Sequence, residues 1–120
     1  MSVLARAVLV LTALVVTVLP AAAGPDDIVI IIANQDYRGT VPKVEYADRD
    51  GEAFAKAARE VLRVPADRII VERNLTYAGF LGYFGRDGEG GPELQRLKAR
   101  LGRASTITFF YSGHGMPAKR

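Results

Sequence analysis

Apolar residues fall in two long uninterrupted runs, with a shorter run between them. Residues 28–33 and 107–111 are rich in β-branched and aromatic side chains, which is typical of strands buried on both faces of a parallel sheet. Residues 68–72 form the shorter run and have a similar character. The pattern therefore predicts three strands, near 28–33, 68–72 and 106–111.

Between these runs the apolar period lengthens to that of a helix. From Tyr46 onward apolar residues share one face until Pro65, which cannot continue a helix. A second helix is predicted after the capping residue Thr76. The residues expected on the buried face of the first helix are Ala47, Phe54, Ala57, Ala58, Val61 and Leu62.

A third helix is predicted to begin at Pro92, because proline suits the first helical position. Leu94, Leu97 and Leu101 are expected to form its buried stripe, and Gly102 is expected in the left-handed conformation after its end. Strands that alternate with helices predict an α/β domain, in which a mainly parallel sheet is flanked by helices on both faces.

The first 23 residues have the pattern of a secretory signal peptide. Arg6 is followed by an uncharged run over 7–19 and by alanines at 21–23. The run is short for a membrane span, so cleavage is the main prediction and an uncleaved signal that anchors the chain is the alternative. The sequence thus predicts an exported protein, periplasmic or extracellular, with one domain in residues 24–120. It contains no cysteine, so no disulfide can stabilise that domain.

The charged residues do not point to nucleic acid. The formal net charge is +3 and includes Arg6 of the predicted signal. The densest basic cluster fits the solvated side of a helix. It consists of Arg96, Lys98, Arg100 and Arg103. The single histidine and the scattered carboxylates have no metal-ligand spacing, and no cofactor is predicted.

His114, the only histidine, follows the last apolar run within Gly113-His114-Gly115. An imidazole exchanges protons near neutral pH, and open α/β sheets keep their chemistry at the carboxyl ends of their strands. His114 is therefore the leading candidate for a functional residue. The alternative is a packing or capping histidine in a glycine turn.

Four segments, in this order, resemble the amino-terminal half of a caspase-like cysteine peptidase domain. They are Ile-Ala-Asn-Gln-Asp-Tyr (32–37), Glu-Tyr-Ala-Asp-Arg-Asp-Gly-Glu-Ala-Phe (45–54), Arg-Ile-Ile-Val-Glu-Arg-Asn (68–74) and Phe-Tyr-Ser-Gly-His-Gly (110–115). The similarity is greatest to the metacaspase and bacterial caspase-homologue branch. It implies a three-layer caspase-like fold with strand order second, first, third, and the activity of a cysteine-type endopeptidase.

The resemblance also implies roles for particular residues. His114 corresponds to the histidine of the catalytic Cys-His dyad. Asp50 corresponds to an acid of the primary specificity pocket, which binds arginine or lysine before the scissile bond of a peptide or protein substrate. Ser112 and Gly113 correspond to substrate-binding positions beside it. For Asp50 the alternative is an acid that favours the positive end of a helix.

The nucleophile is the main departure from the family. Caspase-like domains carry their cysteine roughly 50 residues beyond the histidine, whereas six residues follow His114 and none of the 120 is cysteine. The sheet is therefore expected to stop after its third strand, and the chain as written is expected to be inactive. Two hypotheses follow: part of a caspase-like endopeptidase, or an exported caspase-like module that binds without catalysis.

The sequence fits three other functions or specificities less well. A serine hydrolase is disfavoured because Phe110 stands where a nucleophile elbow needs its first glycine. A phospho-acceptor domain needs an acid at the end of the third strand, where Ser112 to Gly115 stand. A preference for aspartate substrates would need a basic pocket residue, and Arg38 and Lys43 are the candidates.

Overall fold

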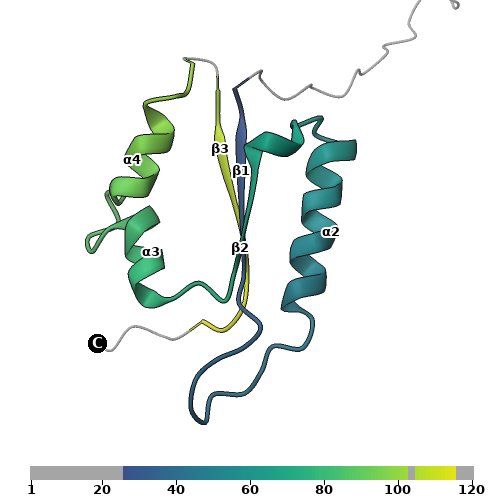
Figure 1. Ribbon diagram of the computed structural model, residues 1–120, viewed down its shortest axis with the longest axis vertical. Coiled ribbons are helices and arrows are strands. Elements are labelled where there is room, and N and C mark those ends of the chain that lie inside the picture. The colour runs from purple at the N-terminus through teal and green to yellow at the C-terminus, as the bar shows by residue number, and fades with distance from the viewer. Residues whose placement is uncertain (1–25, 103–104, 116–120) are drawn as a thin grey trace, which may run out of the picture.

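The computed structural model describes residues 26–102 and 105–115, and these form a three-layer α/β fold (Figure 1). The predicted signal peptide over 1–23 lies outside the described residues. In chain order the elements are β1 Ile28–Ala33, α2 Ala47–Glu60, a 3-10 turn at Ala66–Arg68, β2 Ile69–Arg73, α3 Tyr77–Phe84, α4 Pro92–Lys98 and β3 Ile107–Ser112.

The three strands are parallel and lie in the order β2-β1-β3. Val29 pairs with Ile69 of β2, and Ile28 pairs with Ile107 of β3. The predicted strands, their direction and their order are thereby confirmed. The uninterrupted apolar run of β1 is explained by its central place, because all six of its residues are buried.

Helices cover both faces of the sheet, with α2 on one side and α3 and α4 on the other (Figure 1). Side chains of β1 alternate between the two cores. Ile28, Ile30 and Ile32 pack with Tyr83 and Leu97 from α3 and α4. Val29 and Ile31 pack with three residues from α2 and the segment after it, Ala55, Ala58 and Val64.

The predicted buried face of α2 is partly wrong. Ala47 and Ala58 are buried, but Ala57, Val61 and Leu62 are exposed, Val61 by 66%. The face against the sheet is instead a stripe of small residues, Ala47, Gly51, Ala55 and Ala58. Gly51 allows the closest approach, since a Cβ atom there would lie 3.0 Å from the Ala33 Cβ. The helix axis can therefore lie near the sheet, and the larger residues at its end turn outward.

Pro92 begins α4 and Leu97 is buried in its stripe, as predicted, whereas the prediction for Gly102 is wrong. The helix ends at Lys98, and the chain continues in tight turns in which Arg100 N–H donates to Leu97 O. Gly102 is therefore too far from the helix end to terminate it, and its φ lies outside the left-handed region.

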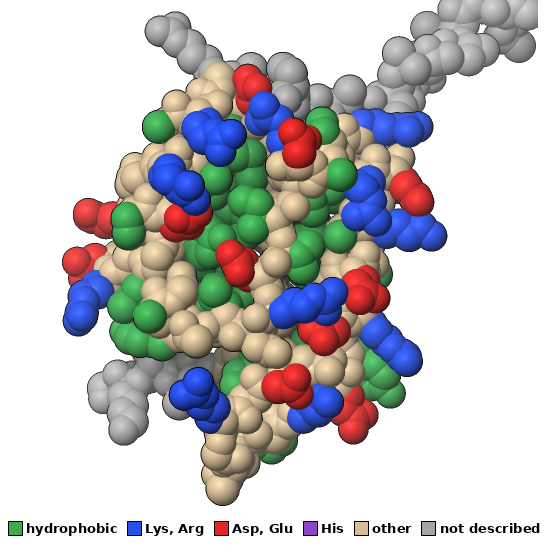
Figure 2. Space-filling view, in the orientation of Figure 1, with side chains coloured by type: hydrophobic (Ala, Val, Ile, Leu, Met, Phe, Trp, Pro, Cys, Tyr) green, Lys and Arg blue, Asp and Glu red, His purple; other side chains and the backbone are tan. Residues whose placement is uncertain are grey.

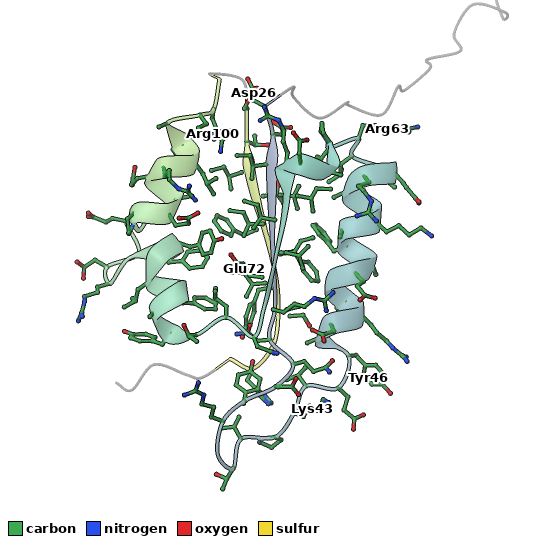
Figure 3. The ribbon with its side chains drawn as sticks, in the orientation of Figure 1. Asp26, Lys43, Tyr46, Arg63, Glu72 and Arg100 are labelled. Atoms are coloured by element: carbon green, nitrogen blue, oxygen red, sulfur yellow. The ribbon has the colours of Figure 1, made fainter. Side chains whose placement is uncertain are left out.

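One half-buried polar contact lies on the α3 side of the sheet. The Tyr83 hydroxyl donates to Glu72 Oε1 at 2.7 Å, and Figure 3 shows Glu72 directed from the sheet toward α3. Burial, and then the bond to Glu72, raise the pKa of Tyr83. The bond gives the Glu72 carboxylate a hydrogen-bond partner, without which its placement against an apolar layer would cost free energy.

Both outer strands are edges within the part of the chain described. Ile28 N–H donates to Thr106 O and Asn34 N–H to Ser112 O, so the alternate backbone groups of β3, at Ile107, Phe109 and Tyr111, point away from β1. At the other edge Val71 is 40% exposed, and Figure 2 shows hydrophobic side chains at the surface around β2. None of the described helices is long and apolar enough to cross a membrane.

Candidate active site

The candidate site lies where the three parallel strands end. Ala33, Arg73 and Ser112 are the last strand residues, so the segments that follow them meet at one edge of the sheet, the lower end of Figure 1. Figure 3 places Lys43 and Tyr46, from the connection between β1 and α2, at the same end. The strand order implied by the resemblance brings these segments together, and the structure has that order.

Two asparagines fix the loops around the site. Asn34 is 6% exposed, and its side-chain oxygen accepts from Leu75 N–H at 2.7 Å while its amide donates to Leu75 O at 3.3 Å. Asn74 has a φ of 51°, and its side-chain oxygen accepts from the N–H groups of Gln35 and Asp36 at 3.0 and 2.9 Å. Asparagine tolerates the left-handed conformation better than most residues. Asn74 therefore both turns the chain after β2 and holds the loop after β1.

Asp50 and Ser112 are brought into contact from different elements. Ser112 Oγ, at the end of β3, donates to Asp50 Oδ2 in the first turn of α2 at 2.8 Å. No hydrogen bond to the other oxygen, Oδ1, is made by the residues that the structure describes. The exposed carboxylate is thus oriented on one side and open to a cationic ligand on the other.

The ring of His114 is anchored by a backbone carbonyl. His114 Nε2 lies 2.7 Å from Pro42 O, and a carbonyl oxygen can only accept. Nε2 must therefore carry the hydrogen in this arrangement, which leaves Nδ1 as the nitrogen that takes up and releases a proton. The Tyr37 ring packs beside the imidazole, with centroids 4.9 Å apart.

Two tyrosine hydroxyls hold the backbone of His114. His114 N–H donates to Tyr37 Oη at 2.8 Å, and Tyr111 Oη–H donates to His114 O at 2.7 Å. Burial raises the pKa of Tyr111 to about 12. Tyr111 therefore stays protonated, and able to donate, well above neutral pH.

Ion pairs border the site rather than enter it. Arg73 at the end of β2 lies 3.2 Å from Asp48 Oδ1 and 3.1 Å from Glu52 Oε1, which ties β2 to the start of α2. Lys43 lies 3.4 Å from Asp36. Asp48 is thus a helix-start acid with a partner, and Lys43 is engaged by an acid of its own loop.

A hollow of about 520 Å³ opens beside Tyr37, between the connection after β1 and the start of α3. It is lined by Asp36, Tyr37, Arg38, Asn74, Leu75, Thr76 and Tyr77. A smaller hollow of about 110 Å³ includes Ile28 and Leu97 and so lies toward the opposite end of the sheet. Within residues 26–102 and 105–115 no three His, Asp or Glu side chains are grouped to hold a metal ion.

The structure gives roles at the site to three residues for which the sequence predicted none, Tyr37, Pro42 and Tyr111. Tyr37 is the last residue of the segment 32–37, and Tyr111 directly precedes Ser112. Neither has a spacing that predicts a hydroxyl directed at His114. Pro42 acts through its backbone oxygen, for which a sequence carries no signal. No family model, curated protein or solved structure matches the chain.

Proposed function

We propose that this chain carries the histidine and specificity pocket of a caspase-like cysteine endopeptidase domain. The observation that supports this most is the anchored imidazole at the end of β3, whose Nε2 is bound to Pro42 O at 2.7 Å. A histidine held in this way has one nitrogen available, and a proton transfer catalyst needs that nitrogen in one place.

In such a peptidase a cysteine thiolate attacks the scissile carbonyl, and the imidazolium gives its proton to the departing amine. On this chain the proton would be held at His114 Nδ1. The bond from Nε2–H to Pro42 O holds the ring in one orientation, with Nδ1 as the nitrogen that faces away from Pro42 O. Pro42 therefore fixes the ring orientation.

The substrate class follows from the Asp50–Ser112 pair. A carboxylate with one oxygen bound to Ser112 offers the other to a cationic side chain. Guanidinium and ammonium groups form charge-assisted bonds with carboxylates, and guanidinium can do so in a bidentate manner. We propose arginine or lysine before the scissile bond. Lys43 is engaged by Asp36, and Arg38 lines the hollow beside Tyr37, so neither is in contact with this pair.

The cysteine is not part of this sequence, so the nucleophile of the proposed peptidase comes from outside it. The same observation favours a second candidate function, an exported module that binds basic peptides and does not cleave them. Both candidates share the pocket, and export rests on the sequence pattern of residues 1–23 in each.

Peptide binding tests the shared proposal, because a chain without cysteine should leave its ligand intact. Four peptides that differ only in arginine, lysine, glutamine or aspartate at one position are titrated into the protein by calorimetry. Arginine and lysine peptides should bind and the others should not. Asp50→Asn should abolish the preference, and Asp87→Asn, on the exposed connection between α3 and α4, is the matched control. Equal affinity for all four peptides would refute the pocket.

A further inference from the structure

Tyr37, Tyr111 and the backbone of His114 form a closed circuit of hydrogen bonds. Tyr111 Oη–H donates to His114 O, so the only proton of that hydroxyl is committed. His114 N–H donates to Tyr37 Oη. The two hydroxyl oxygens are 3.5 Å apart, and the proton still available is that of Tyr37, so Tyr37 is the donor and Tyr111 the acceptor. Every bond in the circuit therefore has one direction.

From this circuit we infer that Tyr37 and Tyr111 are positioning residues, which aim the Nδ1 atom of His114 into the site. The catalytic use of this positioning rests on the proposed function, whereas the hydrogen bonds themselves do not. Both polar backbone groups of residue 114 are held, and the third hold on the residue is the bond from its ring to Pro42 O. A residue fixed at its N–H, its C=O and its ring nitrogen keeps one side-chain direction.

Tyr37 acts on His114 in three ways, one of them because it lies in the same connection as Pro42. Its hydroxyl holds the backbone of His114, its ring packs 4.9 Å from the imidazole, and its loop presents the carbonyl that Nε2 binds. The N–H of Asp36, next to Tyr37, is in turn held by Asn74. The direction of the imidazole thus depends on a loop that Asn74 holds at Asp36 and that His114 contacts at Tyr37.

The circuit also explains why glycine precedes His114. A Cβ atom at Gly113 would lie 2.5 Å from Tyr111 Oη and 2.7 Å from Tyr37 Oη, distances that real Cβ atoms do not show. The φ of Gly113 lies outside the left-handed region, so the reason is space and not backbone freedom. A side chain at this position would separate the two hydroxyls and open the circuit.

Nuclear magnetic resonance of the imidazole tests the inference on the chain as it exists. His114 is the only histidine, so its ring nitrogen signals need no assignment. In the neutral ring of the wild type we expect Nε2 to carry the proton, with exchange of that proton slowed by the bond to Pro42 O. Tyr37→Phe and Tyr111→Phe each remove one hydroxyl, and each should speed this exchange about tenfold and broaden the ring signals.

The matched control is Tyr77→Phe. Tyr77 is 76% exposed, and no hydrogen bond from its hydroxyl is seen among the described residues, so the imidazole signals should stay as in the wild type. Imidazole signals unchanged in folded Tyr37→Phe and Tyr111→Phe proteins would overturn the inference. If both variants fail to fold while Tyr77→Phe folds, the circuit maintains the fold instead of aiming the ring, and the inference also fails.

The same proteins separate this inference from the proposed function. The two tyrosine variants should still bind the arginine peptide in preference to the aspartate peptide, because Asp50 and Ser112 are unchanged. Asp50→Asn should lose the peptide and keep the wild-type imidazole signals. Normal imidazole order without peptide binding would refute the proposed function alone, and peptide binding with an imidazole insensitive to both tyrosines would refute only their positioning role.

Discussion

Asn34 and Asn74 each hold the loop that follows the other's strand. The side chain of Asn34, after β1, binds both backbone groups of Leu75, and the side chain of Asn74, after β2, binds the N–H groups of Gln35 and Asp36. Because β1 and β2 are neighbours, this exchange fixes the two connections against each other. The loop that carries Tyr37 and Pro42 starts from this point.

Substitution of Asn74 should separate its two roles. Asn74→Gly loses the two bonds to Gln35 and Asp36 and keeps the backbone conformation, so we expect a loss of about 1–2 kcal/mol in the free energy of unfolding. Asn74→Ala also places a Cβ residue at a φ of 51° and should lose about 1 kcal/mol more. Urea unfolding measures both. Equal stability of the two variants would contradict the conformational role.

Gly51 should tolerate no large side chain. Its Cα faces Ala33 and Ile31 at the α2–sheet contact, so Gly51→Leu must push the helix away and should cost about 1–3 kcal/mol. Ala57→Leu is the control, because Ala57 lies on the exposed face of the same helix and its substitution should change stability by less than about 0.5 kcal/mol. Thermal unfolding of both proteins gives the comparison. Similar losses would mean that the small-residue stripe is not the contact.

The strands were predictable because their hydrophobic signal is long and continuous. The face of α2 was mispredicted for the opposite reason, since the contact is made by Gly51 and alanines, which carry little hydrophobic signal, while Val61 is large and lies outside. The pairing of Asp50 with Ser112 was anticipated through the resemblance and not through the pattern. Tyr37 and Pro42 lie more than 70 positions from His114 in the chain, and the local bond from Tyr111 ends on a backbone oxygen. No sequence pattern therefore reveals these contacts.

The outer edge of β3 should make the isolated chain associate. Residues 107–112 contain no charge, and the backbone groups of Ile107, Phe109 and Tyr111 point away from β1. We expect concentration-dependent sedimentation and strong binding of a hydrophobic dye. Val71→Lys, on the β2 edge, is the control and should leave the association unchanged. A monomer with a sharp, cooperative melt would contradict this prediction.

The raised pKa of Tyr111 predicts that its hydroxyl ionises at unusually alkaline pH. Its pKa is raised from 10.0 to about 12 in the folded chain, mainly by burial. A raised pKa stabilises the fold fully below pH 10, and that contribution is lost as pH rises toward 12. The absorbance difference between wild type and Tyr111→Phe should therefore contain a late phenolate component. A midpoint near the ordinary tyrosine value would show that the hydroxyl is free.

A chimera tests catalysis and specificity together. Residues 24–115 are fused to the remaining part of a related caspase-like domain that supplies the cysteine. We expect cleavage after arginine or lysine, no turnover in His114→Ala, and a selective loss of basic substrates in Asp50→Ala. Cleavage after aspartate, or an Asp50→Ala chimera with parental activity on arginine, would leave Asp50 as a helix-end acid and nothing more.

The pairing of β1 with β3 has a consequence for the order of folding. Most of the described chain lies between Ile28 and its partner Ile107, so this pairing closes a far longer loop than the pairing of β1 with β2. Closure of a longer loop costs more chain entropy and is slower. Tyr37 and Pro42 can meet His114 only after that closure. The imidazole should therefore reach its native environment last during refolding, so the signals of the single histidine should report the final step of folding.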